Sequence, residues 1–306
     1  MKMKSVYIVY IIISLIISCS SSEEILLNSA NDKYTKGDYE GAIKDLSLLI
    51  ELQPDDYIAL FKRGNAYSRI NKNNRAIEDF SEVIKLSPNF AQAFINRGIE
   101  YLNMGKYKEA INDFSKAIEL NPEIPAAYFN RAYAWNLIDN YGNALRDYSK
   151  AIEINPAYVQ AYVNRGNIKS VLNDYEGSIK DYSTAININP EEVNAYMSRA
   201  GDRAITGDLE GAIDDLTRAI QINSSNPELY LRRGELRMII KNYKDAVDDF
   251  NFVIKNDSEN SFAYLNRGIS KINLNIESGC DDLKRAGELG NIYAYEEIQK
   301  YCGNKN

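Results

Sequence analysis

An arginine recurs every 34 residues along most of this chain. The interval is the same at seven positions, which are Arg63, Arg97, Arg131, Arg165, Arg199, Arg233 and Arg267. The residue after each arginine is Gly or Ala, and the residue three positions before it is Leu, Phe or Tyr. A fixed period of this length means that one supersecondary unit is repeated and that each copy buries its apolar face against its neighbours. We therefore expect an array of like repeats.

Each repeat contains two helical stripes. Phe94, Gly98 and Tyr101 are spaced at i, i+4 and i+7, which places them on one face of a helix, and the same spacing recurs over residues 107–120. Between the stripes, Gly105 can adopt the left-handed conformation that ends a first helix. The equivalent positions in four other repeats also carry residues that tolerate this conformation, namely Gly37, Asn71, Asn173 and Gly207.

This pattern resembles the tetratricopeptide repeat (TPR), a helix-turn-helix of 34 residues. One repeat carries the full family pattern, which here is Phe94, Gly98, Tyr101, Ala110, Phe114, Ala117 and Pro122. The resemblance covers residues 23–293, or eight repeats, and implies an all-α fold, a right-handed TPR superhelix or α-solenoid. The repeats begin near Glu23, Tyr57, Ala91, Pro125, Val159, Val193, Pro227 and Ser261.

The two ends of the array depart from the pattern. The first repeat has Ser29 where the others have arginine, and the second helix of the eighth repeat aligns only after deletion of one loop residue. Asn291 to Cys302 is expected to form a short helix, so that residues 294–306 comprise a capping helix and tail. A cap is needed because the last repeat would otherwise expose its apolar face. No linker interrupts the array, and we expect one elongated domain.

A second charged column follows the arginines by 16 residues, or 15 in the last repeat. It consists of Asp79, Asp113, Asp147, Asp181, Asp215, Asp249 and Asp282, with Asp45 in the first repeat. The matched phase predicts a structural ladder of ion pairs, because an arginine beside a core glycine can bind a carboxylate with two nitrogens. A charged track for a ligand is the alternative. Pairing within a repeat is favoured over pairing between repeats, and the sequence leaves both open.

The TPR resemblance also implies a concave groove that is lined by the first helices and holds a peptide. The matching positions give the groove candidates Phe61, Ile95, Asn96, Phe129, Asn130, Tyr133, Val163, Asn164 and Asn167. Apolar side chains among them would contact apolar ligand side chains, and the amides would hold peptide backbone. Alternatively, these side chains fill space between adjacent first helices and the asparagines bond locally to backbone. The family's carboxylate clamp needs lysine in the column that contains Phe61, Ile95, Phe129 and Val163, and this column has no lysine.

Composition excludes several function classes. The chain has no histidine, which removes the histidine-based catalytic triads and histidine-ligated zinc sites. Its net charge of −7 disfavours a nucleic-acid surface. With no phosphate-binding loop and no metal-ligand spacing, we expect no catalytic site, no metal, no cofactor and no small-molecule substrate.

The first residues form a separate motif. Lys2 and Lys4 precede an apolar run of about a dozen residues, the length of a signal-peptide core. The run ends at Ser18-Cys19, which resembles the bacterial lipoprotein box. This resemblance implies a signal peptide over residues 1–18, lipidation of Cys19 and a short tether over 19–22. The protein would then be exported and held at a bacterial membrane, most simply the outer membrane or the periplasmic face. An ordinary cleaved signal and an uncleaved anchor are the alternatives.

Two cysteines lie near the other end of the chain. Cys280 occupies a column that is otherwise Ile, Leu or Val, so burial as a small apolar residue is one reading. In an exported protein, a disulfide between Cys280 and Cys302 would instead join the last repeat to its cap.

These expectations combine into a non-enzymatic, membrane-anchored scaffold that binds a peptide or a partner protein. A chaperone or assembly factor for exported proteins is the alternative, and a structural spacer without a groove ligand is a third possibility.

Overall fold

The structure, a computed structural model, describes residues 22–303 and is all-α. Within these residues every regular element is a helix, as the repeat pattern predicts. The chain groups into two compact units, Met1–Pro156 (unit 1) and Ala157–Asn306 (unit 2). None of the helices in the described part combines the length and the apolar character that are needed to cross a membrane. The proposed signal peptide and Cys19 lie outside the described residues.

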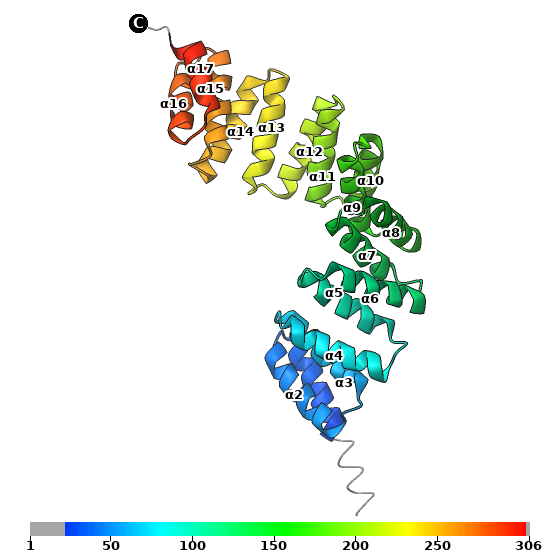
Figure 1. Ribbon diagram of the computed structural model, residues 1–306. Helices are drawn as coiled ribbons and strands as arrows, with labels where there is room; N and C mark the ends of the chain where they lie inside the picture. The colour runs from blue at the N-terminus through cyan, green and yellow to red at the C-terminus, as the bar shows by residue number, and fades with distance from the viewer. Residues whose placement is uncertain (1–21, 304–306) are drawn as a thin grey trace, which may run out of the picture. The chain divides into compact units, whose positions relative to one another are not determined.

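Each unit is a stack of helical hairpins (Figure 1). In unit 1, residues 22–35 are helical and are followed by α2 (Tyr39–Leu52), α3 (Tyr57–Arg69), α4 (Asn73–Leu86), α5 (Ala91–Asn103), α6 (Tyr107–Leu120), α7 (Pro125–Leu137) and α8 (Tyr141–Ile154). Unit 2 holds α9 (Val159–Val171), α10 (Tyr175–Ile188), α11 (Val193–Ile205), α12 (Leu209–Ile222), α13 (Pro227–Ile239), α14 (Tyr243–Asn256), α15 (Ser261–Asn273), α16 (Gly279–Glu288) and α17 (Tyr293–Cys302).

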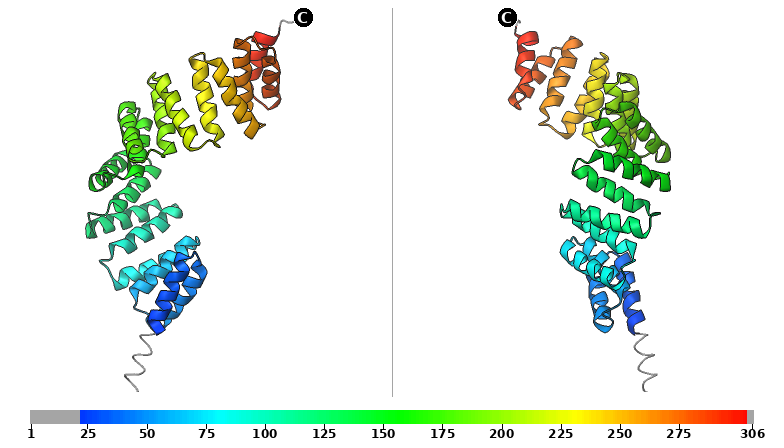
Figure 2. Two further views of the ribbon diagram at one scale, coloured as in Figure 1. Left: turned by 180° about the vertical axis from the view of Figure 1, so that it is seen from behind. Right: turned by 45° about the vertical axis from the view of Figure 1, so that its right-hand side comes forward.

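The predicted phase of the repeats is confirmed. The first helices α3, α5, α7, α9, α11, α13 and α15 begin at the residues where the repeats are expected to start. Within each unit every helix packs on the next one in the chain, and first helices also contact first helices, as α3 and α5 do (Figure 2). The first helices of a unit thus lie side by side. In each unit, we call the surface formed by the side chains of the first helices that point away from the second helices the first-helix face.

A left-handed residue ends each of eight first helices. Its φ is positive at Gly37, Asn71, Gly105, Asp139, Asn173, Gly207, Lys241 and Asn275, all at 34-residue intervals. The five of these positions singled out in the sequence are confirmed, and Asp139, Lys241 and Asn275 share the conformation. This one reversal turns the chain back so that the second helix of each hairpin packs on the first.

Close approach within the hairpins explains the glycine column. A Cβ atom on Gly98 would lie 2.7 Å from the ring of Phe114, which is fully buried in the second helix of the same hairpin. Gly64, Gly166 and Gly234 stand in the same relation to Phe80, Tyr182 and Phe250. Small residues at this crossing let a large ring fill the space between the two helices.

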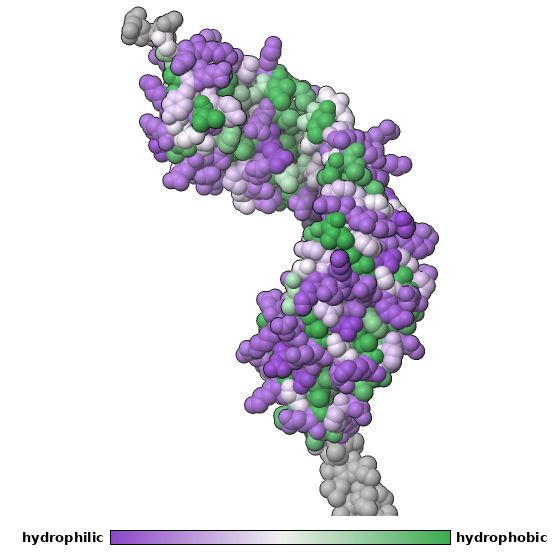
Figure 3. All heavy atoms as spheres, viewed as in Figure 1, coloured by the Kyte–Doolittle hydropathy of each residue, from purple (hydrophilic) through white to green (hydrophobic). Residues whose placement is uncertain are grey.

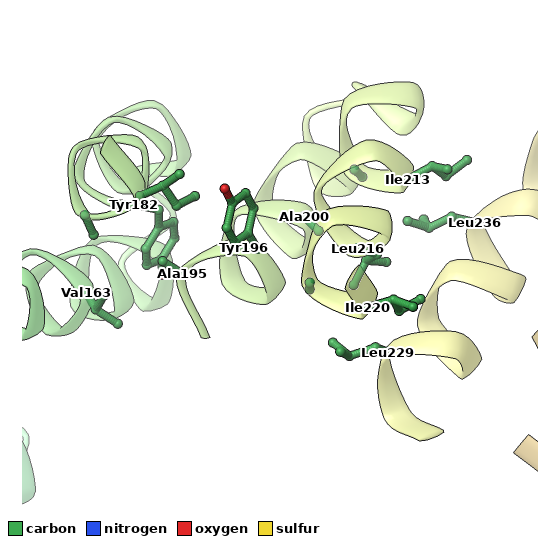
Figure 4. Packing of buried hydrophobic residues seen from close by; sticks show 14 of the residues in the cluster. Val163, Tyr182, Ala195, Tyr196, Ala200, Ile213, Leu216, Ile220, Leu229 and Leu236 are labelled. Carbon is green, nitrogen blue, oxygen red and sulfur yellow. The ribbon is translucent and has the colours of Figure 1, made fainter. Parts of the chain in front are cut away.

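The core of unit 2 continues from one hairpin to the next. In Figure 4, side chains of α12 such as Ile213 and Ile220 lie opposite Leu229 and Leu236 of α13. Leu216, only 1% exposed, lies in the same cluster. Each hairpin therefore covers the apolar flank of its neighbour, as a solenoid requires.

The last repeat is closed by α17. Leu265 of α15, Leu283 and Ala286 of α16, and Ala294 of α17 form one buried cluster. Cys280 and Cys302 are joined in a disulfide, with 5.9 Å between their Cα atoms. Closure of a loop of this length contributes about 3 kcal/mol to the free energy of unfolding. The structure thus holds the cap against the last repeat by both apolar packing and a covalent bond.

Candidate functional site: the ion-pair ladder and the first-helix face

The arginines pair with the aspartates of their own repeats. In α5, Arg97 donates through Nε and Nη2 to the two carboxylate oxygens of Asp113 in α6, at 2.8 and 2.7 Å. The same two-nitrogen contact joins Arg63 to Asp79, Arg131 to Asp147, Arg165 to Asp181, Arg199 to Asp215, Arg233 to Asp249 and Arg267 to Asp282. Hydrogen bonds to Asp113 raise the pKa of Arg97.

The remaining arginine nitrogen reaches the preceding repeat. Nη1 of Arg97 donates to Ser81 Oγ at 3.1 Å, and Ser81 lies 16 residues earlier in α4. The equivalent acceptors of other ladder arginines are Ser47, Ser115, Ser183, Thr217 and Asn251. These acceptors also recur at 34-residue intervals in the sequence, although the predicted ladder did not include them. Each of these arginines therefore fixes its own hairpin and links it to the one before.

Several aspartates have a second cation. Asp45 accepts from Ser29 and from Lys33, both at 2.6 Å, which explains how the first repeat dispenses with arginine. In unit 2 the position equivalent to Lys33 again carries a cation that contacts the ladder aspartate, at Lys169, Arg203, Arg237 and Lys271. In unit 1 this position is aromatic at Tyr67, Tyr101 and Trp135.

The geometry of the ladder indicates a structural role. Asp113 is 6% exposed and both of its oxygens are occupied by Arg97. A ligand could reach such a carboxylate only by breaking a two-nitrogen ion pair. The charged track considered from the sequence is therefore not available at these residues.

Two of the groove candidates are core residues. Ile95 is 1% exposed and packs in the cluster of α5, α6 and α7, and Val163 is 9% exposed in the core of unit 2. They are buried because neighbouring first helices and second helices close over this position. For Ile95 and Val163 the groove prediction is wrong, and the space-filling alternative holds.

The other candidates are partly or fully accessible. Phe61 lies against Phe80 and Phe90, and Phe129 lies against Tyr148, each pair with ring centroids less than 6 Å apart. Asn130 and Asn164 are half-buried, whereas Asn167 and Tyr133 are exposed, Tyr133 to 42%.

Two of the asparagine candidates bond to neighbouring side chains rather than to backbone. Asn96 donates to Asn65 Oδ1 at 2.6 Å across two first helices, and Asn167 accepts from Tyr182 at 2.9 Å.

Cavities lie along the first-helix face in both units. In unit 1 a cavity of about 380 Å³ is lined mainly by residues 30–35 and by Lys62 and Asn65 of α3. In unit 2 two cavities, of about 200 and 360 Å³, share Met197, Gly201 and Arg232 as lining residues. These two adjoin and form one depression across α9, α11 and α13, which we call the Gly201 depression.

An aliphatic stripe borders this depression. Val171, Ile205 and Ile239 occupy the last position of α9, α11 and α13, and their exposed fractions are 62%, 63% and 61%. Hydrophobic residues gather at the surface over this part of unit 2 (Figure 3). Their 34-residue spacing could have been found in the sequence, but their exposure could not. Exposed aliphatic side chains in register are typical of an interaction surface.

Models of one repeat family match this geometry. The tetratricopeptide repeat matches residues 57–90, 91–124, 125–158 and 159–192, and a related TPR repeat model matches residues 30–71. Together the matches cover more than half of the chain. The chain belongs to the tetratricopeptide-repeat family.

Several solved structures share this fold. One from Parabacteroides merdae is 21% identical over 82% of this chain and 99% of its own, with a TM-score of 0.59. PilF of Pseudomonas aeruginosa is 17% identical over 69% and 96%, with a TM-score of 0.57. YrrB, described as a TPR protein with an unusual peptide-binding site, is 21% identical over 58% and 92%, with a TM-score of 0.50. At these identities the likeness shows the fold alone. No curated protein sequence is significantly similar to the chain.

The TPR fold sets the broad class of function. Proteins built from this repeat are in general non-enzymatic scaffolds for protein–protein interactions. Among residues 22–303, no group of three or more acidic or cysteine side chains is placed to hold a metal ion.

Two buried carboxylates lie outside the ladder of this TPR protein. Glu100 is 1% exposed and accepts from Ser68 at 2.5 Å, and its Oε2 has no hydrogen-bond partner among the described residues. Asp202 is 4% exposed and accepts from Ser170 and Ser178. Burial raises the pKa of Glu100, because the charged form loses solvation that the neighbouring Ser68 and Asn103 replace only in part.

The ladder yields a prediction that compares two repeats. Arg97→Leu leaves Asp113 buried without a cation and should destabilise α5 and α6 by about 3 kcal/mol or more. Arg165→Leu should cost about 1.5 kcal/mol less, because Lys169 stays 2.8 Å from Asp181 and a hydrogen bond between charged groups retains about that much. Native-state hydrogen exchange of both hairpins measures the two losses. Equal losses would contradict the role given to the second cation.

Glu100 yields a pH prediction. Because its pKa is raised from the ordinary 4.5 in the folded chain, the folded state holds the proton more tightly than the unfolded state. The stability that protonated Glu100 contributes is complete below pH 4.5 and is lost as the pH rises through the raised value. We expect Glu100→Gln to be more stable than the parent at pH 7, with a smaller difference at about pH 4.

Urea unfolding midpoints at both pH values test this prediction. Glu123→Gln, at an exposed position, is the control and should change the midpoint little. A Glu100→Gln protein that is less stable than the parent at pH 7 would show that the carboxylate is needed in its charged form.

Proposed function

We propose that this TPR protein is a non-enzymatic scaffold, held at a bacterial membrane by lipid on Cys19, that binds a peptide or a partner protein on its first-helix face. One observation carries the binding proposal. The cavities described in both units are lined mainly by first helices, which also carry exposed Tyr133 in unit 1 and the aliphatic stripe in unit 2.

The interior of the hairpins supports a binding role without chemistry. The ladder carboxylates are buried in ion pairs, so they are occupied in holding the repeats together. Polar amides and exposed apolar side chains are what the first-helix face offers, and these groups suit recognition of a peptide. YrrB, which shares the fold, is described as having a peptide-binding site, and this likeness is consistent with the proposal.

The anchor rests on the residues before the repeats. Lys2 and Lys4 provide the positive start of a signal peptide, and the apolar run that ends at Ser18-Cys19 resembles the lipoprotein box. Several acyl chains on one cysteine make membrane attachment effectively stable, whereas one chain alone is marginal.

Replacement of the anchor cysteine tests this part of the proposal. Cys19→Ser should shift the protein from the membrane fraction to the soluble fraction of its own cells and should abolish incorporation of labelled palmitate. Ser21→Ala, which lies next to the anchor and removes no thiol, is the control and should keep both properties. Labelled Cys19→Ser protein in the membrane fraction would rule out lipidation at this cysteine.

Site-specific photocrosslinking tests the binding face. A photoreactive phenylalanine analogue at Tyr133 of the full chain should capture one partner in the native cells. The same analogue at Asn112, which is exposed on the second helix α6, should not capture it. Capture of many unrelated exported proteins would favour the chaperone alternative. Equal capture from both positions, or none from either, would contradict binding on the first-helix face.

A further inference from the structure

The Gly201 depression exists because one side chain is missing. The position that Gly201 occupies on α11 carries a larger residue in each of the other seven repeats, namely Asn31, Asn65, Ile99, Tyr133, Asn167, Glu235 and Ile269. A Cβ atom built on Gly201 meets nothing within 4 Å, unlike one on the core glycine Gly166. Space is therefore left open above Ala200, Leu216 and Leu236, which line the depression with apolar atoms.

Charge is scarce around this depression. Its lining residues on α9, α10 and α11 are uncharged, and the charged ones are Arg232 and Glu235 of α13. Nε of Arg232 already donates to Glu228 at 2.6 Å. The surroundings of the depression thus carry two glutamates, Glu228 and Glu235, and one arginine, so their net charge disfavours a ligand carboxylate.

Glu235 lacks a cation in contact with its carboxylate. The carboxylate accepts from the amide of Asn266 at 3.3 Å, and within residues 22–303 no Lys or Arg forms an ion pair with it. Loss of solvation and the nearby Glu228 raise the pKa of Glu235, and the charge of Arg232 offsets that rise only in part. Because Arg232 forms its ion pair with Glu228, a ligand cation could contact the carboxylate of Glu235 directly.

The aliphatic stripe continues this site. Ile239 lies one helical turn after Glu235 and lines the depression, and Val171 lines its other end. A ligand that spans the depression would therefore cover apolar side chains at both ends and meet one carboxylate between them.

We propose that the Gly201 depression binds a peptide segment in which an aliphatic side chain enters the space over Gly201 and a nearby lysine or arginine pairs with Glu235. This inference rests on the proposed function and names its ligand class. Most of the affinity comes from apolar burial, with the ion pair selecting for a basic and against an acidic segment.

A displayed library tests the ligand class. Random peptides of about 12 residues on phage are selected against the immobilised full chain. Enriched peptides should carry Leu, Ile or Val within about four residues of Lys or Arg and should be poor in Asp and Glu. Enrichment of acidic peptides, or of peptides without this pair, would overturn the inference.

Filling the depression at Gly201 tests where the peptide binds. Gly201→Leu fills the depression and should weaken an enriched peptide by about tenfold or more, because burial of one aliphatic side chain is lost. Since a glycine in a helix is replaced by a better helix former, stability should not fall. Gly142→Leu, at a helical glycine of α8 that also faces open space, is the matched control and should bind like the parent.

The ion pair is tested by one substitution in the protein and one in the peptide. Glu235→Gln should weaken the basic peptide by about threefold, the size expected for an exposed pair. It should leave unchanged a peptide whose basic residue is replaced by norleucine. Equal effects on both peptides would overturn the pairing with Glu235.

The outcomes separate this inference from the proposed function. Suppose that the analogue at Tyr133 captures one partner but Gly201→Leu binds the enriched peptide as the parent does. The proposed scaffold function is then supported and the proposed Gly201 site is wrong. If no peptide is enriched and no partner is captured, both the proposed function and the proposed Gly201 site are wrong.

Discussion

The contact on which the array depends is the arginine that joins two hairpins. In a solenoid each repeat touches only its neighbours, so its stability is set by contacts within repeats and between adjacent ones. Arg97 serves both, because it binds Asp113 through two nitrogens and Ser81 of the preceding repeat through the third. Loss of one such residue therefore weakens a hairpin and its junction together.

This internal use of charge leaves the first-helix face free to vary. The positions that hold the fold repeat closely, with small residues against large rings and arginine against aspartate. The outward positions do not repeat, since one column runs from Asn65 through Tyr133 to Gly201. A chain built in this way can change what it recognises without disturbing what stabilises it.

Spacing alone predicts the repeats, the helix starts and the left-handed turns, because these depend on residues within one repeat. It does not predict which groove candidates are exposed. Phe129 remains half-buried while Ile95 is closed over, although both occupy the same column. The exposure of a side chain depends on the size of the side chains packed around it from adjacent repeats. The residues of one column give no information about those neighbours. The third arginine bond and the Gly201 depression are also relations between repeats and become visible only in three dimensions.

The two kinds of glycine in the helices show how one residue type can serve stability in one place and recognition in another. Gly98 lies under the ring of Phe114, so its missing side chain is filled by the protein's own core. Gly201 lies one position after the equivalent residue of its own repeat, Ala200, and faces open space. A helix loses about 1 kcal/mol for each such glycine. At Gly98 the packed ring offsets that loss, whereas at Gly201 nothing in the described fold does, and a ligand side chain would complete the packing there.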